Sequence, residues 1–251
     1  MNITWNAEGY AENFSFVPRY GEDVLSLLDV KKGVQVIDLG CGAGALTEKL
    51  AERGYAVVGV DASDDMLSVA KKAHPSLSFE SGDALTYSPV QPADAVFSNA
   101  VFHWIDADKQ PYLLQNVARM LRSGGQLVCE FGGKGCAEQV HAALEKTFAQ
   151  HGLTYPRVFY FPTIGEYAPM MEAAGLRVTY AALFDRPTPQ KGEDGLERWI
   201  RMFVRAPFEG ISESLQSQII HETVESLRGK LSTENGWIVD YVRIRLKAVK
   251  L

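Results

Sequence analysis

The feature that most restricts the fold of this chain is a short apolar run that stops at three alternating glycines. Residues 34–39 have the pattern of a buried strand, and Gly40, Gly42 and Gly44 follow it directly. A helical pattern then occupies residues 45–53. Glycines between a strand and a helix allow the backbone to turn tightly and to approach a ligand closely. The segment therefore predicts a ligand-binding turn at the carboxyl end of a strand.

Strands and helices alternate along the next part of the chain. After the glycine turn, strands are predicted at residues 56–60, 77–79, 93–97 and 126–131, and helices at residues 63–73 and 108–121. This alternation is typical of a parallel sheet with helices on both faces. We expect residues 1–251 to form a single α/β domain.

The last part of the chain has a different pattern. A helix is predicted at residues 165–174, a strand at residues 176–184, and a final strand at residues 237–249, in which apolar and basic residues alternate from Val242 to Ala248. The connection between the last two strands, residues 186–235, is longer than a sheet needs and is mostly helical in pattern. Long insertions in compact domains are often lids or binding elements. We expect this insertion to be a helical cap.

The glycine turn is compatible with two kinds of cofactor. Gly40, Gly42 and Ala45 fit the loose fingerprint of a dinucleotide site. Asp61, at the end of the second strand, would be the carboxylate that binds the ribose hydroxyls. Asp38 separates the two possibilities, because its carboxylate would repel a pyrophosphate and attract an ammonium group. S-adenosylmethionine (SAM) carries such an ammonium group, so Asp38 favours SAM, and a nicotinamide-dependent oxidoreductase is the alternative.

Other residues near the predicted sheet edge could complete a nucleoside site. Asp83 follows the third strand and could accept a hydrogen bond from the adenine amine, with Ala84 and Leu85 beside it. On its own, Asp83 would more often be a turn residue. Met66 lies on the second helix, where it could pack against the adenine ring, although core packing explains it equally well.

These segments together resemble the successive motifs of class I SAM-dependent methyltransferases. The matching segments are residues 36–44, 58–61, 82–84 and 98–100, within a region of strong resemblance between residues 30 and 135. The parts before and after this region more loosely resemble the small-molecule subgroup that includes trans-aconitate methyltransferase. The resemblance implies a Rossmann-like, mostly parallel sheet in the order 3-2-1-4-5-7-6, with strand 7 antiparallel and helices on its faces. It also implies that SAM lies over the carboxyl ends of strands 1, 2 and 4.

The residues expected to bind the cofactor come from several segments. They are Tyr10, Asp38, Gly40, Gly42, Gly44, Asp61, Ala62, Met66, Asp83, Ala84, Leu85 and Asn99. Asn99 follows the fourth strand and is expected to contact the methionine end of SAM through its backbone. Tyr10 belongs to an aromatic N-terminal segment, residues 1–29, which would form a lid if it folds across the cofactor. Ordinary helix packing explains the aromatic residues of this segment equally well.

His103 is the histidine nearest to the predicted reaction centre. It follows the fourth strand, and a histidine there could act as a general base with a pKa near neutral. A packing or hydrogen-bonding histidine is the commoner explanation. If the methyl acceptor is a carboxylate, no base is needed, because the nucleophile has no proton to lose.

Arginines in the second half of the chain could bind an acidic acceptor. Arg198, Arg201 and Arg205 lie in the predicted cap near two aromatic residues, Trp199 and Phe203, and guanidinium groups suit carboxylates. A charged helix face in water explains these arginines as well. The final strand carries two further arginines on one face, which could equally be a solubilising edge; they are Arg243 and Arg245.

Composition limits the possible partners and location. The net charge of −6 argues against a broad surface for nucleic acid. The three cysteines form no C-x-x-C pair, so no metal site is predicted, and their sparse use is typical of a reducing compartment. No secretory signal or membrane-spanning stretch is recognisable. We expect a cytoplasmic protein that methylates a small molecule, one candidate being a carboxylate, without nucleic acid or membrane as partner. A SAM-binding protein without transfer activity is a further alternative.

Overall fold

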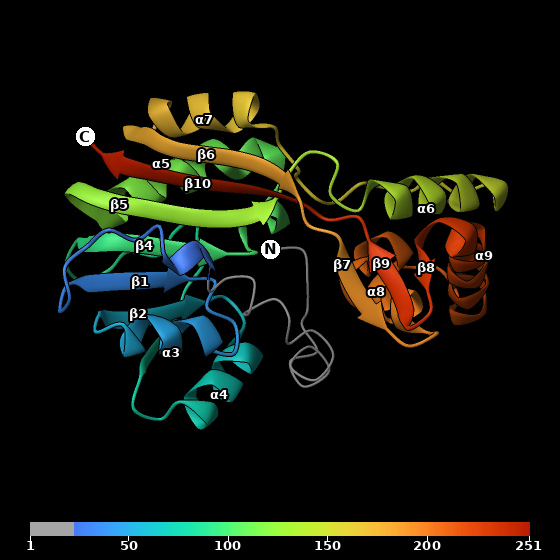
Figure 1. The fold of residues 1–251 in the computed structure, drawn as a ribbon, viewed down its shortest axis with the longest axis horizontal. Coiled ribbons are helices and arrows are strands. Elements are labelled where there is room, and N and C mark those ends of the chain that lie inside the picture. The colour runs from blue at the N-terminus through green and yellow to red at the C-terminus, as the bar shows by residue number, and fades with distance from the viewer. Residues whose placement is uncertain (1–22) are drawn as a thin grey trace.

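A computed structural model describes residues 23–251 and places them in two lobes of unequal size (Figure 1). The larger lobe contains a seven-stranded sheet, and the smaller lobe contains three helices and a three-stranded sheet. Tyr10 and most of the predicted lid lie outside the described residues. Of the predicted lid, only residues 23–29 are described, and residues 23–25 of these are helical.

The large sheet has the order expected from the family resemblance. Its strands run β3-β2-β1-β4-β5-β10-β6, and β10 is antiparallel to both of its neighbours. This confirms the predicted Rossmann-like order, with β10 as the antiparallel seventh strand. The strands are β1 (Gln35–Leu39), β2 (Ala56–Asp61), β3 (Ser78–Ser81), β4 (Ala93–Asn99), β5 (Leu121–Gly132), β6 (Leu176–Asp185) and β10 (Val242–Lys250).

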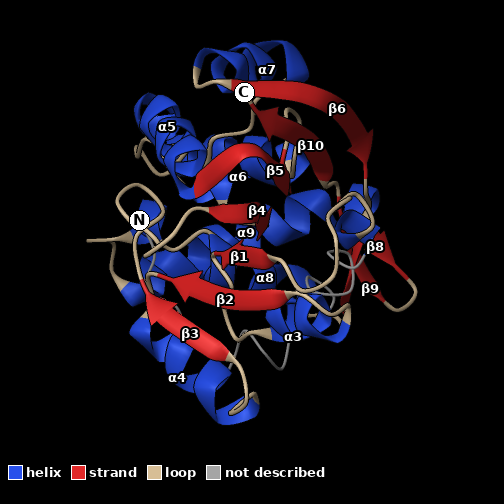
Figure 2. Cartoon of the chain, turned by 90° about the vertical axis from the view of Figure 1, so that its left-hand side faces the viewer, coloured by secondary structure: helices blue, strands red, loops and turns tan. Residues whose placement is uncertain are grey.

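Helices cover both faces of this sheet (Figure 2). They are α3 (Ala45–Glu52), α4 (Asp64–Ala73), α5 (Gln110–Met120) and α7 (Ile164–Ala173). Their starting points are encoded locally. Ser63 caps α4 by accepting a hydrogen bond from the Met66 amide, and Thr163 and Glu166 form a reciprocal capping box at the start of α7.

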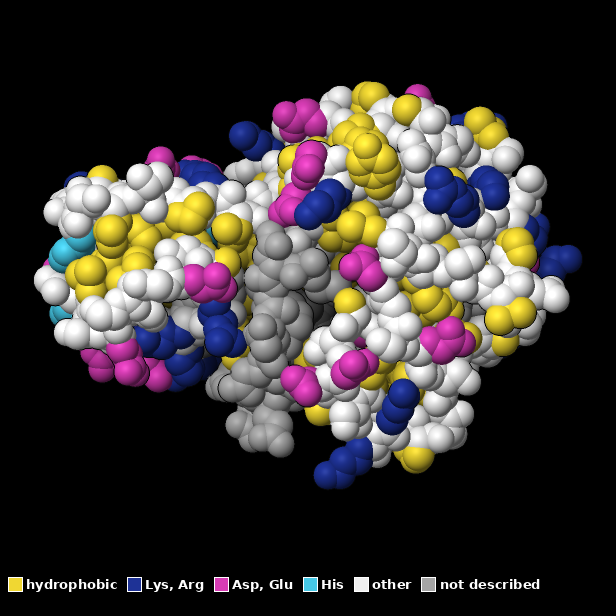
Figure 3. Space-filling view, turned by 180° about the vertical axis from the view of Figure 1, so that it is seen from behind, with side chains coloured by type: hydrophobic (Ala, Val, Ile, Leu, Met, Phe, Trp, Pro, Cys, Tyr) yellow, Lys and Arg dark blue, Asp and Glu magenta, His cyan; other side chains and the backbone are white. Residues whose placement is uncertain are grey.

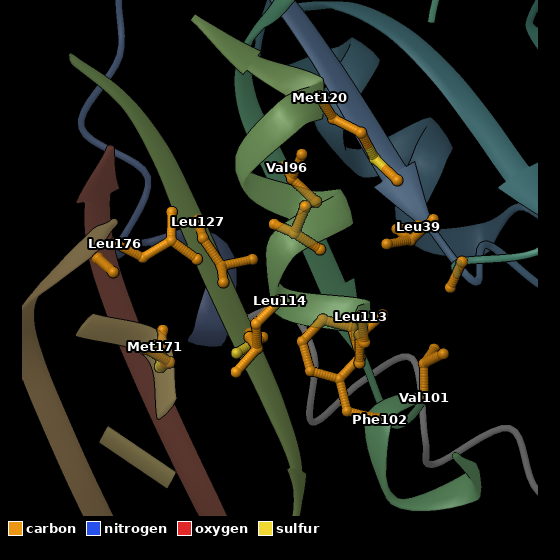
Figure 4. Packing of buried hydrophobic residues seen from close by; sticks show 14 of the residues in the cluster. Leu39, Val96, Val101, Phe102, Leu113, Leu114, Met120, Leu127, Met171 and Leu176 are labelled. Carbon is orange, nitrogen blue, oxygen red and sulfur yellow. The ribbon is translucent and has the colours of Figure 1, made fainter. Parts of the chain in front are cut away.

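Two hydrophobic clusters attach the helices to the opposite faces of the sheet. α5 and α7 pack on one face, in a cluster that includes Ile37 and Val96 (Figure 4). α3 packs on the other face, in a cluster that includes Val36 and Phe97. Consecutive residues of a strand point to opposite faces, so these neighbours join different clusters. Because both faces are covered at the centre of the sheet, β1 and β4 are mostly buried along their length rather than alternating, as the sequence of residues 34–39 indicated.

The smaller lobe is built from two separate parts of the chain. Its elements are α6 (Glu138–Gln150), β7 (Thr188–Lys191), α8 (Gly195–Phe203), α9 (Glu213–Leu231), β8 (Ser232–Thr233) and β9 (Gly236–Val239). They share a hydrophobic cluster of their own, in which Leu144 of α6 lies with Trp199 of α8 and Ile219 of α9. The predicted insertion thus contributes most of this lobe, and its helices are accompanied by a small sheet. No helix was predicted from the sequence where α6 lies.

The predicted final strand is divided between the two sheets. Its first residues form β9 of the small sheet, and the rest form β10 of the large one. The break falls at Asp240 and Tyr241. The Asp240 carboxylate accepts a hydrogen bond from the Gln139 amide, and the Tyr241 amide donates to the Val239 carbonyl, so the chain turns here. The alternation of apolar and basic residues begins only at Val242, after this break.

A buried ionic cluster joins the lobes where the chain leaves the large sheet. Glu130 of β5, 2% exposed at its side chain, pairs with Arg186 at 2.5 Å and with Arg245 at 2.7 Å. Arg186 directly follows β6, and its amide donates to the carbonyl of Tyr241, where the chain returns. Phe184 lies beneath both guanidinium groups. The Glu130 carboxylate therefore holds the place where the chain leaves the large sheet, at Arg186, next to the place where it returns, at Tyr241.

We expect Glu130→Gln to lower the free energy of unfolding by about 3–5 kcal/mol, because it removes the buried charge that pairs with two largely buried guanidinium groups. Urea denaturation measures this change. Glu225→Gln, which breaks an exposed pair with Arg228, is the matched control and should cost less than about 1 kcal/mol. Equal losses in the two variants would contradict the structural role of Glu130.

Candidate functional site

The glycine turn after β1 lies at the carboxyl edge of the large sheet. The amides of Gly40 and Cys41 both donate to the carbonyl of Val60, at 2.7 and 3.0 Å, so the turn is held against the end of β2. Gly44 then forms the N-terminal cap of α3. The structure thus places the predicted ligand-binding turn at the point where β1 and β2 end together.

Gly40 makes a close approach that no other residue type would allow. Its φ is 77°, in the left-handed region that favours glycine. A Cβ atom at this position would lie 2.2 Å from Cγ2 of Val101, which follows β4. The glycine turn and the segment after β4 are therefore in direct contact.

Asp61 connects the glycine turn to the start of α4. Its Oδ2 accepts from the Gly42 amide at 2.8 Å and its Oδ1 from the Ser63 amide at 2.9 Å. Burial raises the pKa of Asp61, and the backbone hydrogen bonds oppose that shift. A carboxylate oxygen has two lone pairs, so each oxygen can still accept a second hydrogen bond, such as one from a ribose hydroxyl.

Asp38 is a buried carboxylate with one oxygen unused. Its Oδ2 accepts from Thr47 Oγ1 at 2.7 Å, and its Oδ1 has no hydrogen-bond partner among residues 23–251. Burial raises the pKa of Asp38 to about 7; the Thr47 hydrogen bond opposes this shift and the charge of Asp61 adds to it. A cation next to Oδ1 would offset the cost of burying the ionised form.

Other predicted cofactor residues also lie along this edge. Met66 is buried, and its Cε would lie 3.1 Å from a Cβ added to Gly42, so it supports the glycine turn. Ala62 is exposed at the end of β2, and Asn99 is half-buried at the end of β4. The ends of β1, β2 and β4 thus bring these predicted residues to one side of the sheet.

Asp83 lies in a turn after β3. Its Oδ1 accepts from the Leu85 amide at 2.8 Å, which is the ordinary contact of a turn aspartate. Ala84 is buried, and its carbonyl accepts from Asn116. Leu85 is half-buried. Asp83 Oδ2 has no hydrogen-bond partner among the described residues, so the binding of an adenine amine stays a prediction.

The segment after β4 leads into a pocket between the two lobes, here called the aromatic pocket. Most of its lining residues are buried, and many of them have aromatic rings. The lining residues are Ala100, His103, Trp104, Cys136, Ala137, His141, Phe159, Phe161, Trp199, Phe203, Tyr241 and Arg243. They come from distant parts of the sequence, and only His103, Trp199, Phe203 and Arg243 were considered from the sequence.

His103 lies in this pocket, in the 3-10 turn η1 (Phe102–Trp104). Its Nδ1 accepts from the Gly132 amide at 3.2 Å, so in the neutral ring the proton resides on Nε2. Burial and the nearby charge of Arg243 hold the pKa of His103 well below its usual value. This geometry favours a neutral donor over the general base that was considered from the sequence.

Arg243 is the cation of the aromatic pocket. Its side chain is buried and lies over the ring of Tyr241, 4.5 Å from the ring centroid. Within residues 23–251 it makes no ion pair and no hydrogen bond through its side chain. A buried guanidinium without a counter-charge is costly, so this position favours an anionic ligand.

The other arginines considered from the sequence have different surroundings. Arg198 pairs with Asp194 and Arg201 with Glu197, both on the exposed side of α8. Arg205 is exposed too, beyond the end of α8. Arg245 is not part of a solubilising edge, because it belongs to the buried cluster around Glu130.

Two residues that line the aromatic pocket have a left-handed backbone. Ala100 has φ 62° and Ala137 has φ 52°, and no other non-glycine residue of the described chain has positive φ. This conformation costs an L-residue about 1–2 kcal/mol. The Ala100 amide donates to Glu130 and the Ala137 amide to Asp240, which hold both turns in place. Unfavourable backbone that is held in this way often accompanies function.

On the face drawn in Figure 3, acidic and basic side chains of the described residues are mixed and form no broad cationic patch. No helix in residues 23–251 combines the length and the apolar composition that crossing a bilayer requires.

Comparisons with known proteins agree on one family. A model described as a methyltransferase domain matches residues 36–125. An uncharacterized methyltransferase of Schizosaccharomyces pombe is 30% identical over 258 aligned residues, which cover 98% of each chain. Trans-aconitate 2-methyltransferase of Agrobacterium fabrum is 33% identical over 147 residues, and the match spans little more than half of either protein (58% and 56%).

A similar fold occurs in a solved complex. Phosphoethanolamine N-methyltransferase 2 of Haemonchus contortus, bound to phosphomonomethylethanolamine and S-adenosylhomocysteine, has a TM-score of 0.58 at 18% identity. The similarity covers 92% of this chain and 52% of that one. At this identity it demonstrates a shared fold.

We expect Gly40→Ala to destabilise the protein more than Gly33→Ala does. Both glycines have positive φ, so each substitution should cost about 1–2 kcal/mol from the left-handed backbone alone. The added methyl meets Val101 at position 40 and nothing within 4 Å at position 33. Thermal and urea unfolding of the two variants measure the difference, and equal losses would contradict the close contact with Val101.

Proposed function

Since this chain belongs to the class I SAM-dependent methyltransferases, we propose that it transfers the methyl group of SAM to a small molecule bound in the aromatic pocket. The proposal is supported chiefly by buried Arg243, a cation without a counter-charge among the described residues, in a pocket next to the segment after β4. The lining is mostly buried, which suits a small acceptor better than a macromolecule.

The carboxyl edge of the sheet has the groups that SAM requires. The unused Oδ1 of Asp38 would bind the ammonium group, and the glycine turn leaves room for the amino-acid end of the cofactor. Asp61 would bind the ribose hydroxyls, and Asp83 with Met66 would flank the adenine. When bound, SAM supplies a methyl group activated by its sulfonium.

The charge of the aromatic pocket favours a carboxylate acceptor. Arg243 provides the cation that was sought among the cap arginines, and no acidic side chain of residues 23–251 lines this pocket. A carboxylate has no proton to lose, so the reaction needs no general base. This agrees with two buried histidines whose pKa values are lowered and which therefore stay neutral.

The contribution of the protein to the reaction is then positional. Arg243 would orient one carboxylate oxygen toward the methyl group, and the aromatic walls would exclude water from the nucleophile. The contact between Gly40 and Val101 holds the cofactor edge next to the start of the pocket. Correct alignment of two reactants is worth up to about 7–11 kcal/mol in well-oriented systems.

A nicotinamide-dependent oxidoreductase, the alternative considered from the sequence, receives no support from the relatives. Absence of transfer activity is the other alternative, and methylation assays on the wild-type protein distinguish it. Tight SAM binding without methylation of any acceptor would favour that alternative.

Asp38 should make SAM binding depend on pH. With its pKa at about 7, Asp38 ionises as the pH rises from about 6 to about 8, and its attraction for the ammonium group increases. Above about pH 8 the α-amino group itself loses its proton, so affinity should fall again. Calorimetric titration across this range measures the dissociation constant. Asp38→Asn should bind more weakly and lose the rise between about pH 6 and 8; an identical pH profile in the variant would contradict the assignment.

Arg243→Leu should lower methyl transfer to carboxylic acids by about tenfold to a hundredfold, because a hydrogen bond to a charged group contributes about 1.5–3 kcal/mol. Transfer is measured with radiolabelled SAM as base-labile methyl ester. Arg201→Leu, in an exposed pair on α8, is the control and should retain activity. SAM affinity should be unchanged in both variants; normal acid methylation by Arg243→Leu would refute the carboxylate site.

A further inference from the structure

A second polar group in the aromatic pocket has no assigned task. His141 of α6 is 3% exposed, and its Nε2 has no hydrogen-bond partner among the described residues. Three rings surround it, those of Phe159, Phe161 and Trp199, and all three line the pocket. A buried polar atom that is left unpaired is destabilising, so a ligand atom that pairs with it would gain affinity.

The proton of His141 can be located from its neighbour. Nδ1 lies 2.7 Å from the hydroxyl of Tyr155, which is also buried. Within residues 23–251 this hydroxyl has no other hydrogen-bond partner. Its single proton is used only if Tyr155 donates to Nδ1, and the neutral ring then carries its proton on Nε2.

His141 stays neutral at physiological pH. Burial lowers its pKa to about 4; the charge of Arg157 adds to this shift and that of Glu138 opposes it. The aromatic pocket therefore presents three donors, the guanidinium of Arg243 and the Nε2–H groups of His103 and His141. A methyl acceptor with oxygen atoms at more than one position could accept hydrogen bonds from all three donors.

We propose that the Nε2–H group of His141, held by Tyr155, is a specificity contact that binds a second oxygen of the acceptor, in addition to the carboxylate bound by Arg243. The favoured substrate class is an oxygen-substituted carboxylic acid. His141 touches the acceptor, and Tyr155 is a positioning residue that acts through it. This inference rests on the proposed function and adds to it.

Paired acids test the contact. Unsubstituted straight-chain acids are compared with ω-hydroxy acids of the same length, and phenyl-substituted acids with their ring-hydroxylated forms. The wild-type protein should have a higher kcat/KM for the oxygenated member of at least one pair. His141→Phe should lower the ratio of kcat/KM for the oxygenated acid to kcat/KM for its parent about tenfold, which corresponds to the loss of one hydrogen bond.

Two further variants separate the contact from packing. Tyr155→Phe keeps the ring but removes the proton that fixes the tautomer, so it should also reduce the preference for the oxygenated acid. His141→Gln keeps an N–H donor and should retain part of the preference. In the His141→Gln background, Tyr155→Phe should have no further effect on it. SAM affinity, measured by calorimetry, should be unchanged and shows that each variant is folded.

Each outcome decides between the proposals. If no acid is methylated or bound, the carboxylate acceptor is wrong and the inference falls with it. If acids are methylated but the wild-type protein prefers neither member of any pair, the His141 contact is wrong while the carboxylate site stands. The His141 contact is also wrong if His141→Phe lowers kcat/KM equally for both members of a pair. Should His141→Phe lose SAM binding, the result for Tyr155→Phe decides.

Discussion

The contact between the glycine turn and Val101 is the constraint on which both halves of the site depend. It joins the end of β1, where the cofactor residues lie, to the segment after β4, where the aromatic pocket begins. The hydrogen bonds of Asp61 fix the same turn from the other side. The two reactants would therefore be positioned by two segments of the chain that pack directly against each other.

Electrostatics divide the molecule into two complementary regions. The cofactor edge contains the buried carboxylates of Asp38 and Asp61, which suit a positively charged ligand. The aromatic pocket contains Arg243 and neutral histidines, which suit a negatively charged one. Each group is costly to bury alone, and each cost falls when the ligand of opposite charge arrives. The binding of each ligand would therefore offset the cost of burying the protein charge that it meets.

Local patterns in the sequence predicted the large sheet and the position of the glycine turn well and the surroundings of the aromatic pocket poorly. The apolar run before Gly40 forms a strand because of its own local pattern. Asp61 lies close to the glycine turn because two neighbouring strands end at the same edge of the sheet. The role of Arg243 was left open between binding an acceptor and forming a solubilising edge, because a period of two shows which residues share a face and not what covers it. The helix that carries His141 and the break at Asp240 depend on packing between distant segments, which no local pattern reports.

The small lobe is attached to the sheet at two places, through α6 after β5 and through the linkers next to the Glu130 cluster. Most of the aromatic pocket belongs to this lobe or to the segments that lead to it, whereas the cofactor edge belongs to the sheet. With the acceptor bound in the aromatic pocket as proposed, mutations in the lobe would change which molecule is accepted without disturbing the SAM site. A new substrate specificity could therefore evolve by changes in the small lobe while selection preserves the large sheet.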